Sequence, residues 1–246
     1  MKLAIPAALP VLALAAATAC GSSNAGTTAS ATQSTSSPSG SSVPGVHQQT
    51  QTYTFDQAIS TLVVDGGAGN VTVTGGARTS IEVTEHLYYS RRVPGTTRTI
   101  SGSALTVGYS CPIQVTCLVS YDVSVPRAIA VKATTRAGAI RIDDVTGAIT
   151  ASAGAGNIHA EGIASGTASF TTLAGTITAD FTAAPSSVTA TSHAGRVTIE
   201  VPSGTSYRVT AQTYVGSATI TVPRDDHSSR SITARTDVGN ITVSTN

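Results

Sequence analysis

A glycine preceded by Ala or Val lies at the centre of a sequence pattern that repeats along most of this chain. The repeated glycines are Gly69, Gly138, Gly156, Gly175, Gly195, Gly216 and Gly239. The last six lie 18, 19, 20, 21 and 23 residues apart. A period near 20 residues is typical of a solenoid, in which each coil covers the core of its neighbour.

Apolar residues flank each glycine at fixed distances, seven and five residues before it and two and four residues after it. Around Gly195 these residues are Val188, Ala190, Val197 and Ile199. The positions between them are mostly polar, which predicts two short strands per copy with alternate side chains inside. We therefore expect an all-β fold, a parallel β-helix-like β-solenoid of about seven two-strand coils with a thin core.

The glycine is expected at the corner between the two strands, where it turns with positive φ or lets the next coil approach without a Cβ clash. If successive copies stack in chain order, Ala190 and Ala211 occupy equivalent inward sites in adjacent layers. Outward residues of successive copies would then stack into ladders. Several of those residues are threonine, which raises ice binding as a hypothesis, although threonine is also simply favoured on exposed strands.

A longer segment separates the first copy from the second, and three alternating stretches within it cover residues 79–89, 99–107 and 117–125. They predict an antiparallel strand insert over residues 75–127, near the N-terminal end of the solenoid, with Pro126 closing its last strand. The β-solenoid domain as a whole is expected over residues 51–246.

The N-terminus has the pattern of an export signal. Residues 1–19 begin with one lysine, continue with an uncharged Ala/Leu-rich run and end in small residues before Cys20. Residues 17–21 resemble the lipobox of bacterial lipoproteins, which implies a lipid on Cys20 and a position on the extracytoplasmic face of the bacterial cell membrane. Cleavage after Ala19 without lipidation is the alternative.

Residues 20–50 are almost wholly small and polar, which predicts a disordered tether. Removal of residues 1–19 leaves 14 − 1 = 13 Lys and Arg against 13 Asp and Glu, a formally neutral chain. Charged residues make up 11%, aromatic residues 4%, and Trp is absent. This composition argues against nucleic-acid partners and stacked-sugar subsites, and no motif predicts a cofactor or a metal.

Cys111 and Cys117 remain as a pair once Cys20 is assigned to the lipid. In an oxidising compartment we expect them to form a disulfide. A redox or metal site is the alternative, but the spacing is not that of a C-x-x-C motif, and no second Cys or His pair is near in the sequence.

The segment 121–126 leading into 130–140, together with the recurrent Gly-x-Ile-Thr-Val coils, resembles the bacterial putative-adhesin family, also called the toast-rack domain. The resemblance covers about residues 55–246. It implies a β-solenoid of envelope proteins whose function is unknown, some of which accompany envelope-stress signalling systems. It carries over no site residues.

Candidate catalytic groups are few. The acidic pairs Asp143–Asp144 and Asp225–Asp226 are both expected in loops between strands, where Asp satisfies turn backbone. The histidines are scattered, and no nucleophile-elbow motif accompanies the many serines.

Two functional hypotheses remain open. In the first, the chain is a surface-displayed, non-enzymatic envelope protein for adhesion or stress sensing, held to the membrane by its lipid and contacting envelope glycans or other surface proteins. In the second it is a polysaccharide-active β-helical enzyme, which would need carboxylates converging on one face.

Overall fold

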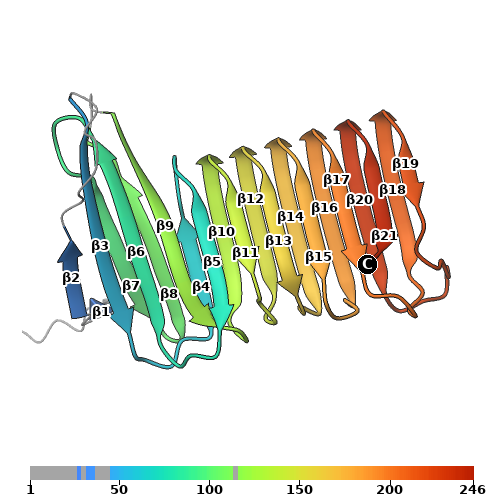
Figure 1. Ribbon diagram of the computed structural model, residues 1–246, viewed down its shortest axis with the longest axis horizontal. Helices are drawn as coiled ribbons and strands as arrows, with labels where there is room; N and C mark the ends of the chain where they lie inside the picture. The colour runs from blue at the N-terminus through green and yellow to red at the C-terminus, as the bar shows by residue number, and fades with distance from the viewer. Residues whose placement is uncertain (1–26, 29–31, 37–44, 113–115) are drawn as a thin grey trace, which may run out of the picture.

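The computed structural model describes residues 27–28, 32–36, 45–112 and 116–246 of the chain. These residues form two long β-sheets that enclose one hydrophobic core, and no helix occurs among them. Figure 1 shows the coils stacked side by side from the first strands to the C-terminal end.

The first sheet has the strand order β1-β7-β8-β4-β10-β12-β14-β16-β20-β18. In that order the bounds are Thr27–Thr28, Gly95–Ser101, Ala104–Ser110, Thr61–Asp65, Ala130–Ala137, Ile149–Ala155, Thr167–Ala174, Ser187–Ala194, Ser231–Val238 and Arg208–Val215. The second sheet has the order β19-β21-β17-β15-β13-β11-β5-β9-β6-β3-β2. Its bounds are Ala218–Ile220, Ile241–Thr245, Val197–Val201, Ile177–Phe181, Ile158–Ile163, Ile140–Asp143, Val71–Gly76, Cys117–Pro126, Ile81–Tyr89, His47–Phe55 and Thr32–Ser36.

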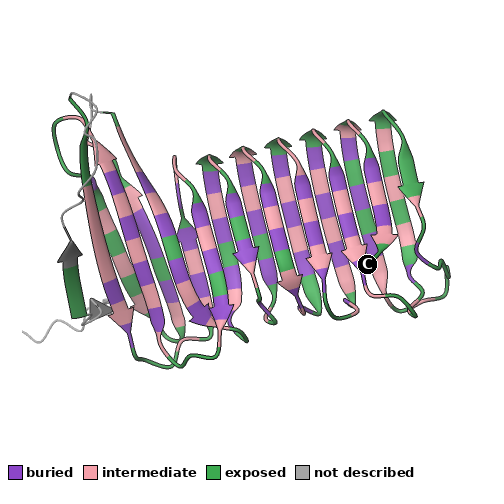
Figure 2. Cartoon of the chain, in the orientation of Figure 1, coloured by how far each residue is buried: buried purple, intermediate pink, exposed green. Residues whose placement is uncertain are grey.

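The β-solenoid prediction is confirmed, because each repeat supplies one strand to each sheet and equivalent strands pair in parallel. Alternation places Val188 and Ala190 in the core, with relative exposures of 1% and 0%, whereas Thr189 between them is half-buried on the outer face. Figure 2 shows this banding of buried and exposed residues along the coils.

The glycine corners are as tight as expected. Gly175 has φ +154°, and a Cβ atom added to it would lie 2.1 Å from the carbonyl oxygen of Gly156 in the preceding coil. That oxygen also accepts a 3.0 Å hydrogen bond from the buried Thr172 hydroxyl, and Ser192 makes the same bond to Gly175. Glycine is therefore required where successive coils touch backbone to backbone.

The expected chain-order stacking is wrong at the C-terminal end. Strand β20 lies between β16 and β18, so Ala190 faces Ala234, and Ala234 in turn faces Ala211. Ala190 and Ala211 are two layers apart. The two last repeats carry similar inward residues in the first sheet, but in the second sheet the larger Ile241 lies in the inner coil and the smaller Ala218 in the end coil. The loop after β19 returns the chain past β18. Arg230 secures that loop by donating to the carbonyl of Ala184 at 2.7 Å.

The segment 75–127 contains the expected antiparallel pairs, β6 with β9 and β7 with β8, and Pro126 ends β9. Because β8 also pairs in parallel with β4, and β9 with β5, this segment extends both sheets. The stretch 99–107, expected as one strand, is divided by a tight turn in which Gly102 has φ +58°.

Ordered strands also occur inside the segment predicted to be a tether. Strand β2 pairs with β3, and β3 itself begins at His47. The predicted signal peptide and Cys20 lie outside the described residues. Across the part of the chain that the structure covers, no helix has the length and hydropathy of a membrane span.

Candidate functional site

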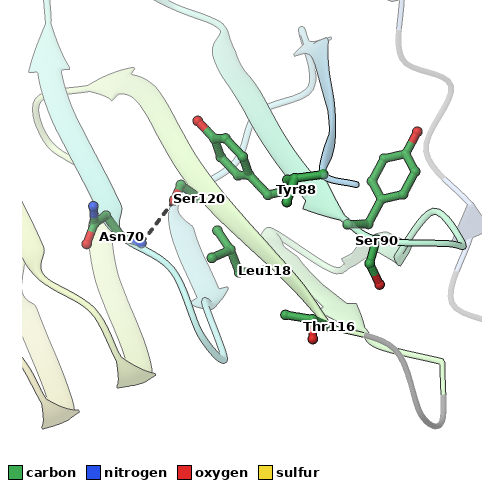
Figure 3. Close-up of a pocket in the computed structure, with 8 residues that line it drawn as sticks. Asn70, Tyr88, Ser90, Thr116, Leu118 and Ser120 are labelled. Atoms are coloured by element: carbon green, nitrogen blue, oxygen red, sulfur yellow. Dashed lines mark hydrogen bonds between the residues drawn. The ribbon is translucent and has the colours of Figure 1, made fainter. Parts of the chain in front are cut away.

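A hollow of about 440 Å³ lies on the outer face of the second sheet, where β6 and β9 approach their ends. It is lined by Val46, Asn70, Tyr88, Tyr89, Ser90, Thr116, Leu118 and Ser120. We call it the tyrosine hollow. Figure 3 shows its lining residues and the strands that carry them.

The strand register explains why these side chains gather. In the antiparallel pair β6–β9, Tyr88 stands opposite Leu118, and alternation turns both toward the outer face. Ser120 follows two residues after Leu118 on the same face, and its Oγ accepts a 3.1 Å hydrogen bond from the backbone N–H of Asn70. The floor of the hollow is therefore apolar and its border polar.

The far wall of the hollow is held by backbone and covalent contacts. The backbone N–H of Ser90 donates to the carbonyl of Thr116 at 3.1 Å, which closes the end of the β6–β9 ladder. Next to Thr116, Cys117 is disulfide-bonded to Cys111, with the two Cα atoms 5.9 Å apart. The disulfide predicted from the sequence is present, and it holds the start of β9 beside the hollow.

The ring of Tyr89 is supported from β3. His47 stacks on it with 5.4 Å between ring centroids and an interplanar angle of 27°. Aromatic pairs with this separation restrict each other's orientation. Because side chains alternate along a strand, Tyr89 lies on the opposite face of β6 from Tyr88 and packs against the core.

A line of three polar side chains crosses the same face beside the hollow. The His86 Nε2 atom lies 2.9 Å from Asp122 Oδ2, and its Nδ1 atom lies 3.3 Å from the Thr50 hydroxyl. This grouping resembles a hydroxyl–His–Asp triad in composition. It has no oxyanion hole, however, because β3, β6 and β9 each have neighbours on both sides and their N–H groups are engaged in the ladders.

The carboxylates of the polysaccharide-enzyme hypothesis occupy another place. Arg141 donates to Asp143 and to Glu161, both at 2.7 Å, beside a hollow of about 360 Å³. Hydrogen bonds from His159 and then from Arg141 lower the pKa of Glu161. A carboxyl group held ionised in this way is poorly suited to act as a general acid.

Asp225 and Asp226 do not join that group. They lie in the loop before β20, near the last coil, whereas Asp143 and Asp144 lie beside the coil of β11. Asp225 accepts a hydrogen bond from the backbone N–H of His227, the turn role expected for it. Among the described residues, no group of three His, Cys, Asp or Glu side chains is arranged to hold a metal ion.

Sequence reasoning missed a buried ion pair in the insert. Glu85 is fully buried, and both of its carboxylate oxygens accept from Arg98 Nη1, at 2.8 and 2.9 Å. Burial raises the pKa of Glu85 against the opposing effect of Arg98. The guanidinium also lies 3.8 Å from the ring centroid of Tyr53. One signal was available, since Glu85 takes an inward position in the alternation of Ile81, Val83 and Leu87.

Comparison with known proteins identifies one family. The model of the family described as Toastrack DUF4097 matches residues 29–246. No curated protein matches the chain.

Solved structures give distant likenesses. One, described as a putative cell adhesion protein from Clostridium sporogenes, is 11% identical with a TM-score of 0.42, over 81% of this chain and all of that one. A putative adhesin from Bacteroides fragilis is 13% identical, with a TM-score of 0.37 over 80% of this chain and 97% of that one. A third, from Parabacteroides distasonis, is described as a putative lipid binding protein; it is 9% identical, with a TM-score of 0.32 over 80% of this chain and 96% of that one.

Proposed function

The chain belongs to the Toastrack DUF4097 family, and we propose that it is a non-enzymatic recognition protein that binds a glycan of the cell envelope in the tyrosine hollow. We further propose that a lipid on Cys20 holds it on the extracytoplasmic face of the bacterial membrane. The observation that carries the proposal is the combination, in one hollow, of the outward-facing Tyr88 and Leu118 with a border of hydroxyl and amide groups.

The chemistry of this lining favours a sugar. Sugar rings present apolar C–H faces with hydroxyls around their edge, and Tyr88 and Leu118 supply apolar contact area for such a face. Ser90, Thr116 and Ser120 supply hydroxyls at the border. The volume of about 440 Å³ is within the range of small-ligand sites.

The polar groups outside the hollow support a binding role over a catalytic one. The Thr50–His86–Asp122 line lacks a place for a developing oxyanion, and the carboxylates near Arg141 are ion-paired. A glycan bound at the hollow would meet neither a paired acid and base nor an activated nucleophile.

Equilibrium binding to purified envelope polysaccharides tests the proposal, with Tyr88→Ala as the informative variant. We expect it to bind about tenfold or more weakly, because loss of an aromatic contact surface of this kind costs at least about 1.4 kcal/mol. Thr84→Ala is the matched control, since Thr84 lies on the same face of β6 outside the hollow.

Equal affinity of the Tyr88→Ala and Thr84→Ala variants would refute the assignment of the hollow. Release of new reducing ends from the polysaccharide would favour the enzyme hypothesis instead. Binding of lipid vesicles but of no glycan would favour lipid binding as the function instead, which is the activity named in the description of the Parabacteroides distasonis protein.

A further inference from the structure

The two ends of the solenoid differ in how their outermost strands are covered. At the N-terminal end, β2 and β1 run antiparallel along the outer strands β3 and β7. At the opposite end both sheets stop at a single coil, β18 and β19, whose open side is covered at Tyr207, directly before β18, by a bridge to Arg224. Figure 1 shows this coil, here called the open coil, at the far end from the first strands.

The open coil leaves part of the core uncovered. Ala211 is partly exposed, whereas Ala190 and Ala234 in the same inward column have exposures of 0% and 1%. Val209 and Ile220 are also only partly buried. In every inner layer a neighbouring coil covers these positions, so the open coil presents the surface on which a further coil would pack.

Exposed apolar residues concentrate at this end. Tyr214, Val215 and Val238 have exposures of 74%, 62% and 54%, and they are three of the six large hydrophobic residues exposed in the described structure. Val215 and Val238 are direct neighbours across the β18–β20 ladder. Clustering of this kind marks an interaction surface more than a scatter of single apolar residues would.

The edge is protected at one end, where Tyr207 directly before β18 donates to the carbonyl of Pro223 and accepts from the N–H of Asp225 in the loop after β19, but not along β18 itself. Residues 208–220 contain one charged side chain, Arg208, and neither Lys nor Pro. The backbone N–H of Arg208 donates to Arg230, so by the alternation of a parallel ladder the N–H and C=O groups of Val209, Ala211 and Thr213 point away from β20. These unpaired groups form a template for another strand.

We propose that the open coil is a homodimer interface, in which β18 pairs antiparallel with β18 of a second copy about a two-fold axis at Ala211. This register joins the three outward-pointing residues of one copy to those of the other, Val209 to Thr213 and Ala211 to Ala211, and it ends before Tyr207, whose edge groups are already bonded to Pro223 and Asp225. It also brings Arg208 of each copy beside Tyr214 of the other, a cation–π partner, and keeps the two arginines at opposite ends of the pair. Two-fold contacts of one surface with itself are the commonest in soluble oligomers.

The dimer extends both sheets through the contact and places the two tyrosine hollows toward opposite ends of a long rod. This consequence rests on the proposed function: copies anchored at their N-terminal sides would meet tip to tip across facing membranes. Dimerisation in solution does not depend on glycan binding, so failure of one proposal is separate from failure of the other.

The experiment measures mass by light scattering and sedimentation for the full chain carrying Cys20→Ala, so that no lipid contributes. We expect a dimer that Ala211→Pro converts to a monomer, because proline removes an N–H that points to the open edge and leaves the bonds to β20. Tyr214→Ser should weaken the dimer at least tenfold. Leu173→Ser is the matched control, since Leu173 is 56% exposed at the same repeat position in an inner coil.

A cysteine at the axis gives a second measurement. Antiparallel partners lie about 5.5 Å apart at their Cα atoms, within the reach of a disulfide, so Ala211→Cys should cross-link and Thr189→Cys should not. A chain that stays monomeric at its highest soluble concentration overturns the proposal. So does a dimer that survives Ala211→Pro and Tyr214→Ser, because it would use another surface.

Discussion

The hydroxyl of Thr213 donates a 2.9 Å hydrogen bond to the carbonyl of Gly239, a residue 26 positions later in the chain. Elsewhere the equivalent hydroxyl bonds a glycine that precedes it, as Thr172 bonds Gly156 and Ser192 bonds Gly175. The contact therefore shows that the last two coils stack in the reverse of their order in the chain. The final repeat, which contains β20, lies between the coil of β16 and the repeat that contains β18.

Paired cysteines can test this order on the outer face of the first sheet. Thr189 faces Thr233, which in turn faces Thr210, so Thr189 and Thr210 are two strand spacings apart, about 9.6 Å. The Thr189→Cys/Thr233→Cys variant should form an intramolecular disulfide, detected by mass after alkylation, and Thr189→Cys/Thr210→Cys should not. The reverse result would restore stacking in chain order.

Inward and outward positions one residue apart should differ sharply in tolerance. Ala190→Asp would bury an unpaired carboxylate, which we expect to lower the free energy of unfolding by several kcal/mol. Thr189→Asp should cost under about 1 kcal/mol, because that side chain reaches solvent. Urea melts give both values, and equal losses would contradict the register.

At the C-terminal end, the cost of an inward Asp should depend on which of the last two coils is the inner one. Ala211 is partly exposed while Ala234 has 1% exposure, so Ala234→Asp should destabilise the chain more than Ala211→Asp in the monomer. Chain-order stacking would have predicted the opposite, because the repeat of Ala234 would then form the exposed end. The same urea melts, at a concentration where the chain is monomeric, distinguish the two orders.

Glu85 should make stability depend on pH. Folding raises its pKa above the ordinary value of 4.5, so the folded chain holds this proton more tightly than the unfolded chain. The contribution of Glu85 to the free energy of unfolding is therefore greatest below pH 4.5 and falls as pH rises through the raised pKa. The difference between wild type and Glu85→Gln, measured by urea melts from acid to neutral pH, should show this fall.

Removal of the partner gives the complementary prediction. Arg98→Met leaves the buried carboxylate unpaired, which we expect to cost about 3–5 kcal/mol at neutral pH. The loss should shrink in acid, where Glu85 is neutral in both states. A cost that is unchanged between acid and neutral pH would mean that Arg98 acts through packing on Tyr53 rather than through the ion pair.

The lipid anchor is tested at Cys20. Labelled palmitate should enter the wild-type chain, and Cys20→Ala should move the protein from the membrane fraction to the medium or leave it unprocessed. A wild-type chain that takes up no label contradicts the lipobox interpretation and favours cleavage after Ala19.

The periodic part of the fold could be predicted from the sequence because its forces are local. Alternation of Val188, Thr189 and Ala190 fixes which side of a strand faces the core, and glycine at each corner is the residue that tolerates a neighbouring backbone at 2.1 Å. The spacing of Cys111 and Cys117 likewise bounds a short loop, whose disulfide the structure contains.

The tyrosine hollow was not predictable in this way. Tyr88 and Leu118 meet because two strands separated by a long connection adopt one antiparallel register, and Asn70 joins them from the turn before β5. Nothing within any one segment marks these residues as neighbours. The buried Glu85–Arg98 pair depends similarly on two sheets facing each other, although the inward place of Glu85 in its strand was visible.

What the sequence by itself determined was the coil: its two strands, its inward face and its glycine corner, all set by interactions within about 20 residues. Only the tertiary structure decided which coil lies on which. The repeats around Gly216 and Gly239 share the alternation and the glycine corner of every other coil, so the periodic pattern alone does not give their order in the stack. The order is settled by contacts between distant segments, among them Thr213 with Gly239 and Arg230 with Ala184.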